Sequence, residues 1–493
     1  MLEEEKLSGM DNLFLQIEHP RRLMTVSSLW VFDGRLDSRI VYQSVEQLCD
    51  EFPRYASVPA HGSALYTPVW SNPIGWQPHM NIEYHRLKAP SEQSLQEYIS
   101  DMQSRPFDYS KPLWELHAIS GLHDEKCAFF WKAHHCLCDG LGFIDSLLEI
   151  TSHEPSRQNN KASLDDGTYK KSNNRQKQQQ RRNANYKKKK QLLRTAPLLN
   201  DIPDQIYFLF PAWLQWLTTW CCIWMNRVYL VWITLLHDLW VILLCILPAR
   251  LSHHRDLFYT GLQSYKKQVA WSDTIRLKDI RAVRRVLGGT VNDVMVLVVT
   301  RCIKGYLEEN GVRHDDFVRL FVPISQRDMD DQSFQNVVSG IWGWFSMKDL
   351  DTKELLAQVR AEMQAVKVSR IPSLMYSIFV QGILDNFPGL LTGMLPMVNR
   401  AANIPHGVFT NLPGPTDPVE FGGKTISDVY VLPPQNGKGG IAIGLVSHCD
   451  KVNITVMADA HPKYPHVARS ICNRFAPEFH LLLREANMKA TRR

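Results

Sequence analysis

The sequence lacks the features that mark several large protein classes. Its ten cysteines are scattered, without the regular spacing of a disulfide framework, so we expect reduced thiols that face the cytosol. It contains no Cys-x-x-Cys pair and no second cluster of histidine and cysteine that would complete a tetrahedral site, so no metal is expected. The N-terminus is acidic and carries no apolar core, so no cleaved signal peptide is expected.

Charge is unevenly distributed along the chain. The net charge is +6, yet 11 basic residues and no acidic residue lie between positions 170 and 194, so the rest of the chain has a net charge near −5. This stretch contains few apolar residues, which predicts a polar, polybasic linker over 156–205 that does not fold on its own. Polybasic runs bind nucleic-acid backbones or anionic lipids, and the next segment decides between them.

An apolar segment follows the linker, at residues 206–248. It contains two stretches of about 20 residues, each long enough to cross a bilayer as a helix. The first stretch is rich in tryptophan: Trp213, Trp216, Trp220 and Trp224. A basic cluster before such a segment favours lipid headgroups over nucleic acid. Pro211 and Asp238 favour a hairpin or an interfacial element over two ideal spans, and buried helices packed on soluble domains remain the alternative.

The most informative motif runs from His134 to Gly140 and has the form His-His-x-x-x-Asp-Gly. The run 127–133 before it has the composition of a buried strand, and the apolar spacing of 141–148 after it suits a helix. Both histidines are therefore expected at a strand end, on a turn that Gly140 lets bend sharply. Such a position presents an imidazole to a substrate.

Acyl transfer from a thioester to an alcohol requires a base that is active near neutral pH. Histidine, with an unperturbed pKa of about 6.5, fits this task, and we assign the role to His135. Asp139 is expected to orient the turn through a hydrogen bond or an ion pair. His134 lies on the opposite side of the extended segment and is expected to be structural. On the motif alone, a pair of ordinary core histidines and a metal site remain open alternatives.

The motif resembles the signature of CoA-dependent acyltransferases of the chloramphenicol-acetyltransferase type. More narrowly, the chain resembles the bifunctional wax ester synthase/diacylglycerol acyltransferase family. Further segments carry this resemblance in order: 7–15, 112–115 with a Pro-Leu-Trp motif, 290–294 with an Asn-Asp motif, 322–327, 411–415 and 437–441. The sequence departs from the family in two places. Thr25 stands where the family usually has histidine, and His448 stands where it commonly has tyrosine.

The remaining motif residues are catalytic or supporting candidates. The amide of Asn292 is expected to donate to the thioester oxygen as negative charge develops there. Asp293 has two interpretations, a direct catalytic part or the acidic partner of a helix N-cap at Thr290. The segments 411–415 and 437–440 are expected to be turns, the second leading into a strand over 441–446. Structural support or substrate binding is expected of the other four residues: Gly140, Trp114, Arg327 and Asn411.

The resemblance implies an α/β fold with two chloramphenicol-acetyltransferase-like halves, each a mixed sheet flanked by helices, and an apolar helical insert between them. We place the halves at 1–155 and 249–493, with the active site between them. Because His135 and Asn292 must then meet, both halves lie on one side of the bilayer. The insert accordingly crosses an even number of times, returns as a hairpin or lies in the interface.

These inferences predict an acyl-CoA-dependent O-acyltransferase that makes wax esters from long-chain alcohols, triacylglycerol from diacylglycerol, or both. Acyl-CoA is the co-substrate, and neither another cofactor nor a nucleic-acid partner is expected. The expected location is a cytosol-facing membrane or lipid-droplet surface, at the endoplasmic reticulum if the source is eukaryotic. Two alternatives stay open: an acyltransferase for a soluble acceptor, and a catalytically silent protein that binds lipid or tethers droplets.

Overall fold

A computed structural model describes residues 5–60, 66–153, 257–259, 261, 263–328, 331, 333–436 and 438–491, together with eight positions between 224 and 239. The chain divides into two compact units. The first comprises Met1–Glu154, Val241–Gln326 and Ser333–Arg493, and the second comprises Pro155–Trp240 and Arg327–Gln332. The predicted polybasic linker and most of the predicted apolar insert lie outside the described residues. The elements below belong to the first unit.

The first of two large sheets contains the strand that ends in the paired histidines. This strand, β6 (Cys127–His134), is buried along its whole length and lies between two antiparallel neighbours. The full order is β4 (Ile82–Arg86), β5 (Trp114–Ser120), β6, β1 (Thr25–Phe32), β14 (Lys424–Leu432), β13 (Val419–Phe421) and β7 (Ser152–His153). β4 and β5 are parallel and the other pairs antiparallel, so the sheet is mixed.

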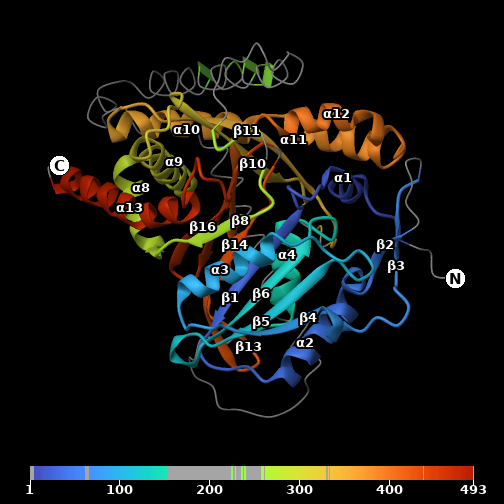
Figure 1. The fold of residues 1–493 in the computed structure, drawn as a ribbon. Helices are drawn as coiled ribbons and strands as arrows, with labels where there is room; N and C mark the ends of the chain where they lie inside the picture. Colours follow the sequence, from blue (N-terminus) through green and yellow to red (C-terminus); the bar gives the residue numbers. More distant parts are fainter. Residues whose placement is uncertain are drawn as a thin grey trace, which may run out of the picture. The chain divides into compact units, whose positions relative to one another are not determined.

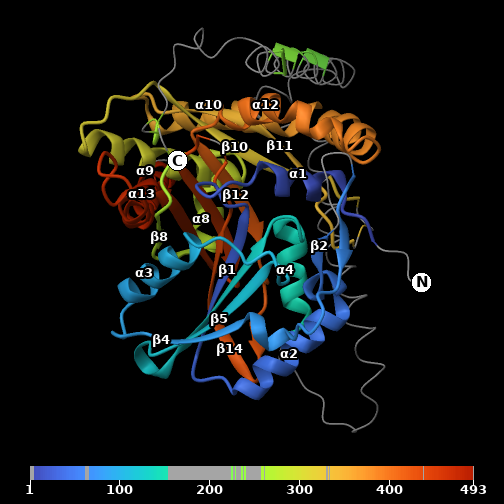
Figure 2. The same ribbon diagram turned by 45° about the vertical axis from the view of Figure 1, so that its right-hand side comes forward.

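The two faces of this sheet pack against different layers, because successive side chains of a strand point to opposite faces. Trp30 and Trp131 share a core with α2 (Ser38–Glu51) and α4 (Gly140–Glu149). Leu29 and Phe130, the residues just before them on the two strands, share a different core with α3 (Glu92–Gln103). Figure 2 shows α3 on one side of the sheet and α2 and α4 on the other. The paired histidines therefore end a strand that is covered on both faces.

The second large sheet is also mixed. Its order is β11 (Val338–Ser346), β10 (Phe317–Ser325), β12 (Gly407–Pro413), β15 (Ile441–His448), β16 (Lys451–Asp459) and β8 (Lys267–Trp271), and β9 (Ile275–Arg276) also pairs with β16. The pairs β10–β12 and β12–β15 are parallel, and the others are antiparallel. A small separate sheet contains β2 (Val58–Ala60) and β3 (Val69–Ser71).

Helix α9 (Val291–Glu309) is the central helix of the second half, and it packs against α8 (Leu277–Leu287), α10 (Thr352–Val368) and α13 (Val467–Thr491), as Figure 1 shows. It begins with a capping box: Thr290 Oγ1 accepts from the Asp293 N–H at 3.2 Å, and Asp293 Oδ2 accepts from the Thr290 N–H at 2.7 Å. Within the described ranges no single helix reaches the length and apolarity of a bilayer span, and α8 and α9 do so only as a pair bent by 97°.

The remaining helices are shorter. Near the N-terminus lies α1 (Gly9–Ile17), and three 3₁₀ turns follow it: η1 (Pro53–Ala56), η2 (Pro78–Asn81) and η3 (His123–Glu125). A helical layer follows α10, formed by α11 (Ile371–Leu374), the π-helix η6 (Met375–Leu384) and α12 (Leu390–Ala402), with a turn at 385–389 between the last two. This layer packs on α1, and α1 in turn contacts the second of the paired histidines.

The chain crosses between the two sheets through β13 and β14. These strands follow β12 of the second sheet in sequence but complete the first sheet, and β15 returns to the second. Where β14 passes β15, an added Cβ at Gly444 would collide with the backbone oxygen of Val431. Only glycine allows the two strands to approach so closely at this point. The boundaries at 155 and 249, which separate the two predicted halves from the insert, stay a prediction. They assign β13 and β14 to the C-terminal half, although these two strands complete the first sheet.

The predicted α/β class with two mixed sheets is confirmed, as are the strands that contain 127–133 and 441–446 and the helix after the motif. Two local predictions are wrong. Asn411–Pro413 belongs to β12 rather than to a turn, because parallel pairing with β15 extends the strand through it. Gly140 makes no sharp bend: it is the first residue of α4, and its φ is not in the left-handed region.

We predict that Gly444→Ala destabilises the protein by about 1–3 kcal/mol, the usual cost of forcing a methyl group into a closed contact. Chemical denaturation would measure this free energy of unfolding. Gly393→Ala in α12 is the matched control, because its added Cβ meets nothing within 4 Å. Equal stabilities for the two variants would contradict the close approach of β14 and β15.

Candidate active site

The backbone around His135 is held by the neighbouring strand. Thr25 of β1 pairs with His134 of β6, and the His135 N–H donates to the Met24 carbonyl oxygen at 2.6 Å. The strand pairing therefore continues one residue past the end of β6. As a result, the two histidines leave the sheet in fixed and opposite directions.

The side chain of His134 is fully buried and tied to the scaffold. Its Nδ1 accepts from the Cys136 N–H at 3.0 Å, and its Nε2 lies 3.0 Å from Glu18 Oε2. Glu18 also accepts from the Met24 N–H at 2.6 Å and from the Tyr109 hydroxyl at 2.7 Å. Burial raises the pKa of Glu18, but its contacts with His134, Tyr109 and Met24 outweigh burial and lower it. His134 thereby connects the motif to the segment before β1.

His135 is presented differently. Its side chain and backbone together are 9% exposed, and its ring stacks on Phe14 of α1 with centroids 4.0 Å apart. Its Nδ1 lies 2.8 Å from Asn336 Oδ1, whereas its Nε2 makes no hydrogen bond to any residue that the structure describes. Burial lowers the pKa of His135, because a charged imidazolium loses solvation there. The ring is therefore expected to be neutral near pH 7.

The amide of Asn336 determines which nitrogen of His135 carries the proton. Asn336 Nδ2 donates to Asp11 Oδ1 at 2.7 Å and to the His135 carbonyl oxygen at 2.6 Å. Both partners accept hydrogen bonds only, so the amide oxygen must face the imidazole. His135 Nδ1 accordingly donates to that oxygen, and the lone pair resides on Nε2. A lone pair directed away from the scaffold is what a general base needs.

Asp11 is itself held in place from several sides. It is the N3 residue of α1 and closes a capping box with Ser8. Its Oδ2 lies 3.1 Å from Arg54 Nη1, which also donates to the Leu137 carbonyl oxygen at 3.1 Å. Burial raises the pKa of Asp11, and Arg54 and Asn336 act against this effect. The donors around the carboxylate thus fix the amide of Asn336 in one orientation.

Asp139 supports the same arrangement from the other end of the motif. It is the N-cap of α4, and its Oδ1 accepts from the Gly142 N–H at 2.9 Å. Its Oδ2 accepts from the N–H of Val337, the residue after Asn336, at 3.0 Å. One carboxylate therefore both begins the helix and fixes the segment that carries Asn336. Gly140 follows directly, and an added Cβ there would lie 3.5 Å from the Leu412 side chain.

The other predicted site residues make contacts of their own. Asn292 and Asn411 form a pair, in which Asn411 Nδ2 donates to Asn292 Oδ1, so the amide nitrogen of Asn292 is not used in this hydrogen bond. Asp293 is occupied by the capping box of α9. Trp114 is buried at the start of β5, and its Nε1 donates to the Tyr55 carbonyl oxygen at 2.6 Å. Arg327 belongs to the second unit, where its Nη1 lies 3.7 Å from Asp331 Oδ1.

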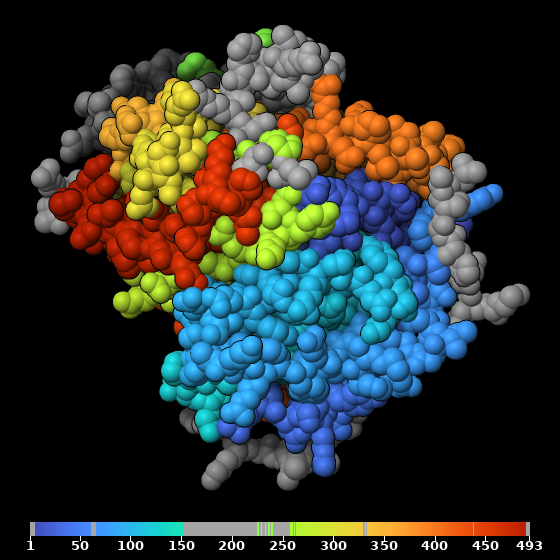
Figure 3. All heavy atoms as spheres, in the orientation of Figure 1, coloured from blue at the N-terminus to red at the C-terminus, as the bar shows by residue number. Residues whose placement is uncertain are grey.

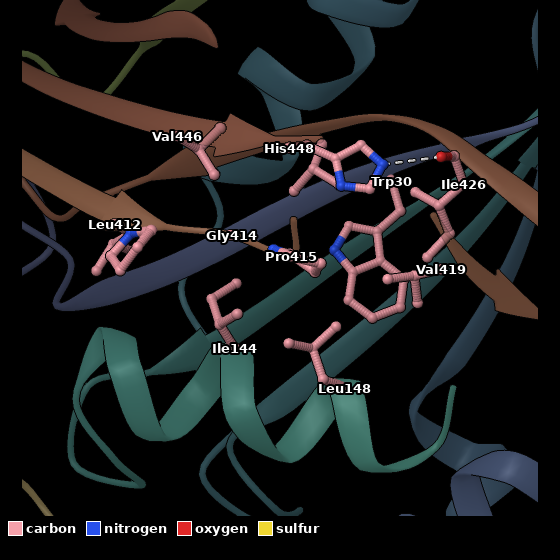
Figure 4. Close-up of a pocket in the computed structure, with 12 residues that line it drawn as sticks. Trp30, Ile144, Leu148, Leu412, Gly414, Pro415, Val419, Ile426, Val446 and His448 are labelled. Carbon is pink, nitrogen blue, oxygen red and sulfur yellow. Dashed lines mark hydrogen bonds between the residues drawn. The ribbon is translucent and has the colours of Figure 1, made fainter. Parts of the chain in front are cut away.

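A small apolar cavity of about 10 Å³ lies along α4, which starts at the motif (Figure 4). Ile144 and Leu148 of α4 point into it, and Trp30 and His448 line its opposite side. The rest of the lining is also mostly apolar: Leu412, Pro413, Gly414, Pro415, Val419, Ile426, Val429 and Val446. His448 Nε2 donates to the Ile426 carbonyl oxygen at 3.0 Å, and burial lowers its pKa. The only ionisable side chain of the pocket is therefore expected to be neutral.

Comparisons with known proteins agree with the motifs. Residues 7–205 match the family model described as "Wax ester synthase/diacylglycerol acyltransferase catalytic domain", and residues 334–482 match "WS/DGAT C-terminal domain". Together the two matches cover more than half of the chain. The chain belongs to the wax ester synthase/diacylglycerol acyltransferase family. It is accordingly an acyltransferase, and the resemblance inferred from its motifs is confirmed.

Relatives in this family match over nearly their whole length. One from Mycobacterium bovis is 22% identical over 474 residues, which cover 94% of this chain and 95% of the relative. One from Mycobacterium tuberculosis is 23% identical over 477 residues, with coverage of 94% and 95%. Both are named diacylglycerol O-acyltransferases, and both names carry a provisional qualifier.

Solved structures show the same fold. The wax ester synthase/diacylglycerol acyltransferase from Marinobacter aquaeolei VT8 matches with a TM-score of 0.59 and 19% identity, covering 99% of this chain and 100% of that one. The first condensation domain of the calcium-dependent antibiotic synthetase matches with a TM-score of 0.54 and 13% identity, covering 98% and 96%. The expected two-halved architecture of this acyltransferase family is therefore confirmed.

The sequence analysis missed three residues of the His135 environment in this family member. Phe14 and Asp11 lie in the quoted segment 7–15, where Ser8 and Asp11 have the spacing of a capping box but indicate no further role. Asn336 lies in none of the motifs found in the sequence and is 201 residues from His135. No local pattern indicates that an asparagine will meet a histidine at this distance, so only the structure reveals it.

We predict that Asn336→Leu lowers kcat about 10- to 100-fold, because a hydrogen bond to a group that becomes charged contributes about 1.5–3 kcal/mol. Steady-state kinetics on an acyl-CoA and an alcohol would measure it. Asn453→Leu is the matched control, because Asn453 is also buried. It lies in β16 of the second sheet, and its Nδ2 donates to the Val429 carbonyl oxygen of β14 at 3.1 Å. Wild-type kcat in folded Asn336→Leu protein would contradict the orienting role.

The pH dependence gives a separate prediction. Because burial lowers the pKa of His135, kcat/KM should decline on the acid side with an apparent pKa below about 6.5, as the imidazolium cannot accept a proton. The hydrogen bond to Asn336 raises this pKa, so the acid limb of Asn336→Leu should move to lower pH. A limb at or above the ordinary histidine value would show that another group is the base.

Proposed function

We propose that the protein is an acyl-CoA-dependent O-acyltransferase that esterifies a long-chain alcohol, diacylglycerol, or both at a membrane surface. The observation that carries the proposal is the lone pair on His135 Nε2, which is fixed there by Asn336 and Asp11. A neutral imidazole with one free nitrogen, held in a largely buried site, suits proton transfer from an alcohol.

The chemistry follows from this geometry. Nε2 takes the proton of the acceptor hydroxyl, and the oxygen attacks the thioester carbonyl carbon. The carbon–sulfur bond breaks, and the imidazolium returns its proton to the coenzyme A thiolate. Asn292, whose amide nitrogen is free to donate, is our candidate for stabilising the negative oxygen in between. No covalent enzyme intermediate is needed, because positioning of the two substrates lowers the barrier.

A lipid acceptor is supported by the pocket along α4. The helix begins five residues after His135, and its inward face supplies Ile144 and Leu148 to the apolar lining. The cavity itself is small, about 10 Å³, so an aliphatic chain enters only if the lining side chains move apart. An apolar lining that opens in this way suits such a chain better than a polar acceptor, because burying polar groups without partners is costly. We therefore favour a chain-bearing alcohol over the soluble acceptor of the alternative hypothesis.

A membrane location is supported by the second unit. Its eight described positions between 224 and 239 are helical, and Trp224, Trp232 and Leu236 are 53%, 61% and 61% exposed. Large exposed apolar side chains at helical spacing are typical of segments that contact lipid. Acyl-CoA carries charged phosphates and stays in water, whereas the acceptor partitions into lipid. An enzyme that joins them is best placed at the boundary.

We predict that membranes from a host that lacks neutral lipid and expresses this protein convert labelled acyl-CoA and long-chain alcohol or diacylglycerol to esters, resolved by chromatography. His135→Ala should reduce the rate about 10²- to 10⁴-fold, the usual contribution of a general base. His480→Ala on the exposed face of α13 is the control. No ester from wild-type protein would favour the silent lipid-binding alternative. Ester formation only with soluble alcohols would favour the soluble-acceptor alternative.

A further inference from the structure

The layer formed by α11, η6 and α12 has an unusual outward face. Large apolar side chains are exposed along it by between 44% and 60%: Leu374, Met375, Ile378, Phe387, Leu390 and Met397. We call these six residues the apolar helical face. Figure 3 shows this segment, in orange, at the surface of the molecule. Clusters of this kind on a soluble surface mark an interaction site.

Charge is nearly absent from this layer. Between positions 371 and 399 the only charged residue is Asp385, and its carboxylate accepts from the Gly9 N–H at the start of α1. The preceding helix, α10, is different: it exposes Lys353 and Glu354 and buries Leu355 and Leu356. An ordinary amphipathic helix therefore lies directly before one whose outward face is also apolar.

The inner side of the same layer leads to the catalytic residue. Phe379, Leu384 and Leu391 form a buried cluster with residues of α1, and Phe14 packs against this cluster. Phe14 also stacks on the ring of His135. The helical layer and α1 thus lie between the apolar helical face and the imidazole, with no charged side chain in the cluster.

We propose that the apolar helical face docks on the surface of a phospholipid membrane, where the acceptor is dissolved. The inference rests on the proposed function and deepens it, because it assigns lipid contact to residues outside the predicted insert. Docking here places the helical layer that packs on α1, and through Phe14 on His135, at the lipid surface where the acceptor is dissolved.

Lipid is favoured as the occupant for two reasons. Asp385 is the only charged residue between 371 and 399, and the polar residues exposed beside the apolar ones, such as Gln381 and Asn386, are uncharged and suit the headgroup region of a membrane. In addition, the cation Arg370 is exposed at its edge, as the N-cap of α11, whereas the nearby Lys367 Nζ lies 3.7 Å from Asp293 Oδ1. Cations beside an apolar surface fit the anionic headgroups of a membrane.

The test uses the full-length chain and vesicles of phosphatidylcholine with phosphatidylserine. Ile378→Glu/Leu390→Glu should lower the bound fraction in a flotation assay at least about 10-fold, since carboxylates are poorly tolerated in the lipid interior. Leu481→Glu/Met488→Glu is the matched control, with two exposed apolar residues of α13. Ile378→Gln/Leu390→Gln, a milder change, should show a smaller loss in the same direction.

Activity is measured twice, with a long-chain alcohol in vesicles and with a soluble short-chain alcohol in their absence. The vesicle rate should fall with binding, while the soluble rate stays at the wild-type value. Failure of the proposed function is distinct, because wild-type protein would then make no ester in either assay, whatever its binding.

Three results would overturn the docking proposal. In the first, wild-type protein does not float with vesicles, or the face variants float as well as the control. In the second, the face variants change the oligomeric state by light scattering, which means that a second copy covers the face. In the third, deletion of 206–248 abolishes flotation while both face variants float normally, so that the insert alone contacts lipid.

Discussion

The orientation of one side-chain amide underlies the whole site. Asn336 can place its oxygen against His135 only because its nitrogen is occupied by the Asp11 carboxylate and a backbone oxygen. If the amide turned over, it would offer N–H groups to Nδ1 and move the imidazole proton to Nε2. The nitrogen that faces the substrate would then lack a lone pair. The base catalysis that we propose for His135 thus depends on a carboxylate that does not contact the ring.

Holding that amide requires segments from both ends of the chain to meet. Asp139 binds the N–H of Val337, and farther away Arg22 forms a two-bond ion pair with Asp459, at 2.8 and 2.9 Å. A buried ion pair adds little to stability, because desolvation cancels much of its attraction, but breaking one is costly and so it specifies a single arrangement. The crossing of β14 into the first sheet likewise fixes the two halves in a single arrangement. The two halves are therefore built as one body.

The chemistry and the surface of this family member are complementary. A neutral base in a buried site suits an acceptor that brings one hydroxyl and a long apolar chain. The apolar helical face and the exposed positions of the second unit suit the lipid phase in which such an acceptor resides. The polybasic stretch at 170–194 and the exposed Arg370 beside α11 suit its anionic surface. A site of action at the boundary between lipid and water is consistent with all of these features together.

The sequence by itself determined the strand, turn and helix around the paired histidines, because burial periodicity and capping act over a few residues. It also indicated the capping box at Thr290 and, through its ordered motifs, the family and the two-halved fold. Only the tertiary structure decided that Asn336 and Asp11, 325 residues apart, orient the base. It alone decided that Asn411 continues a strand and that Gly140 begins a helix. These outcomes depend on pairing between distant segments, which sequence periodicity does not encode.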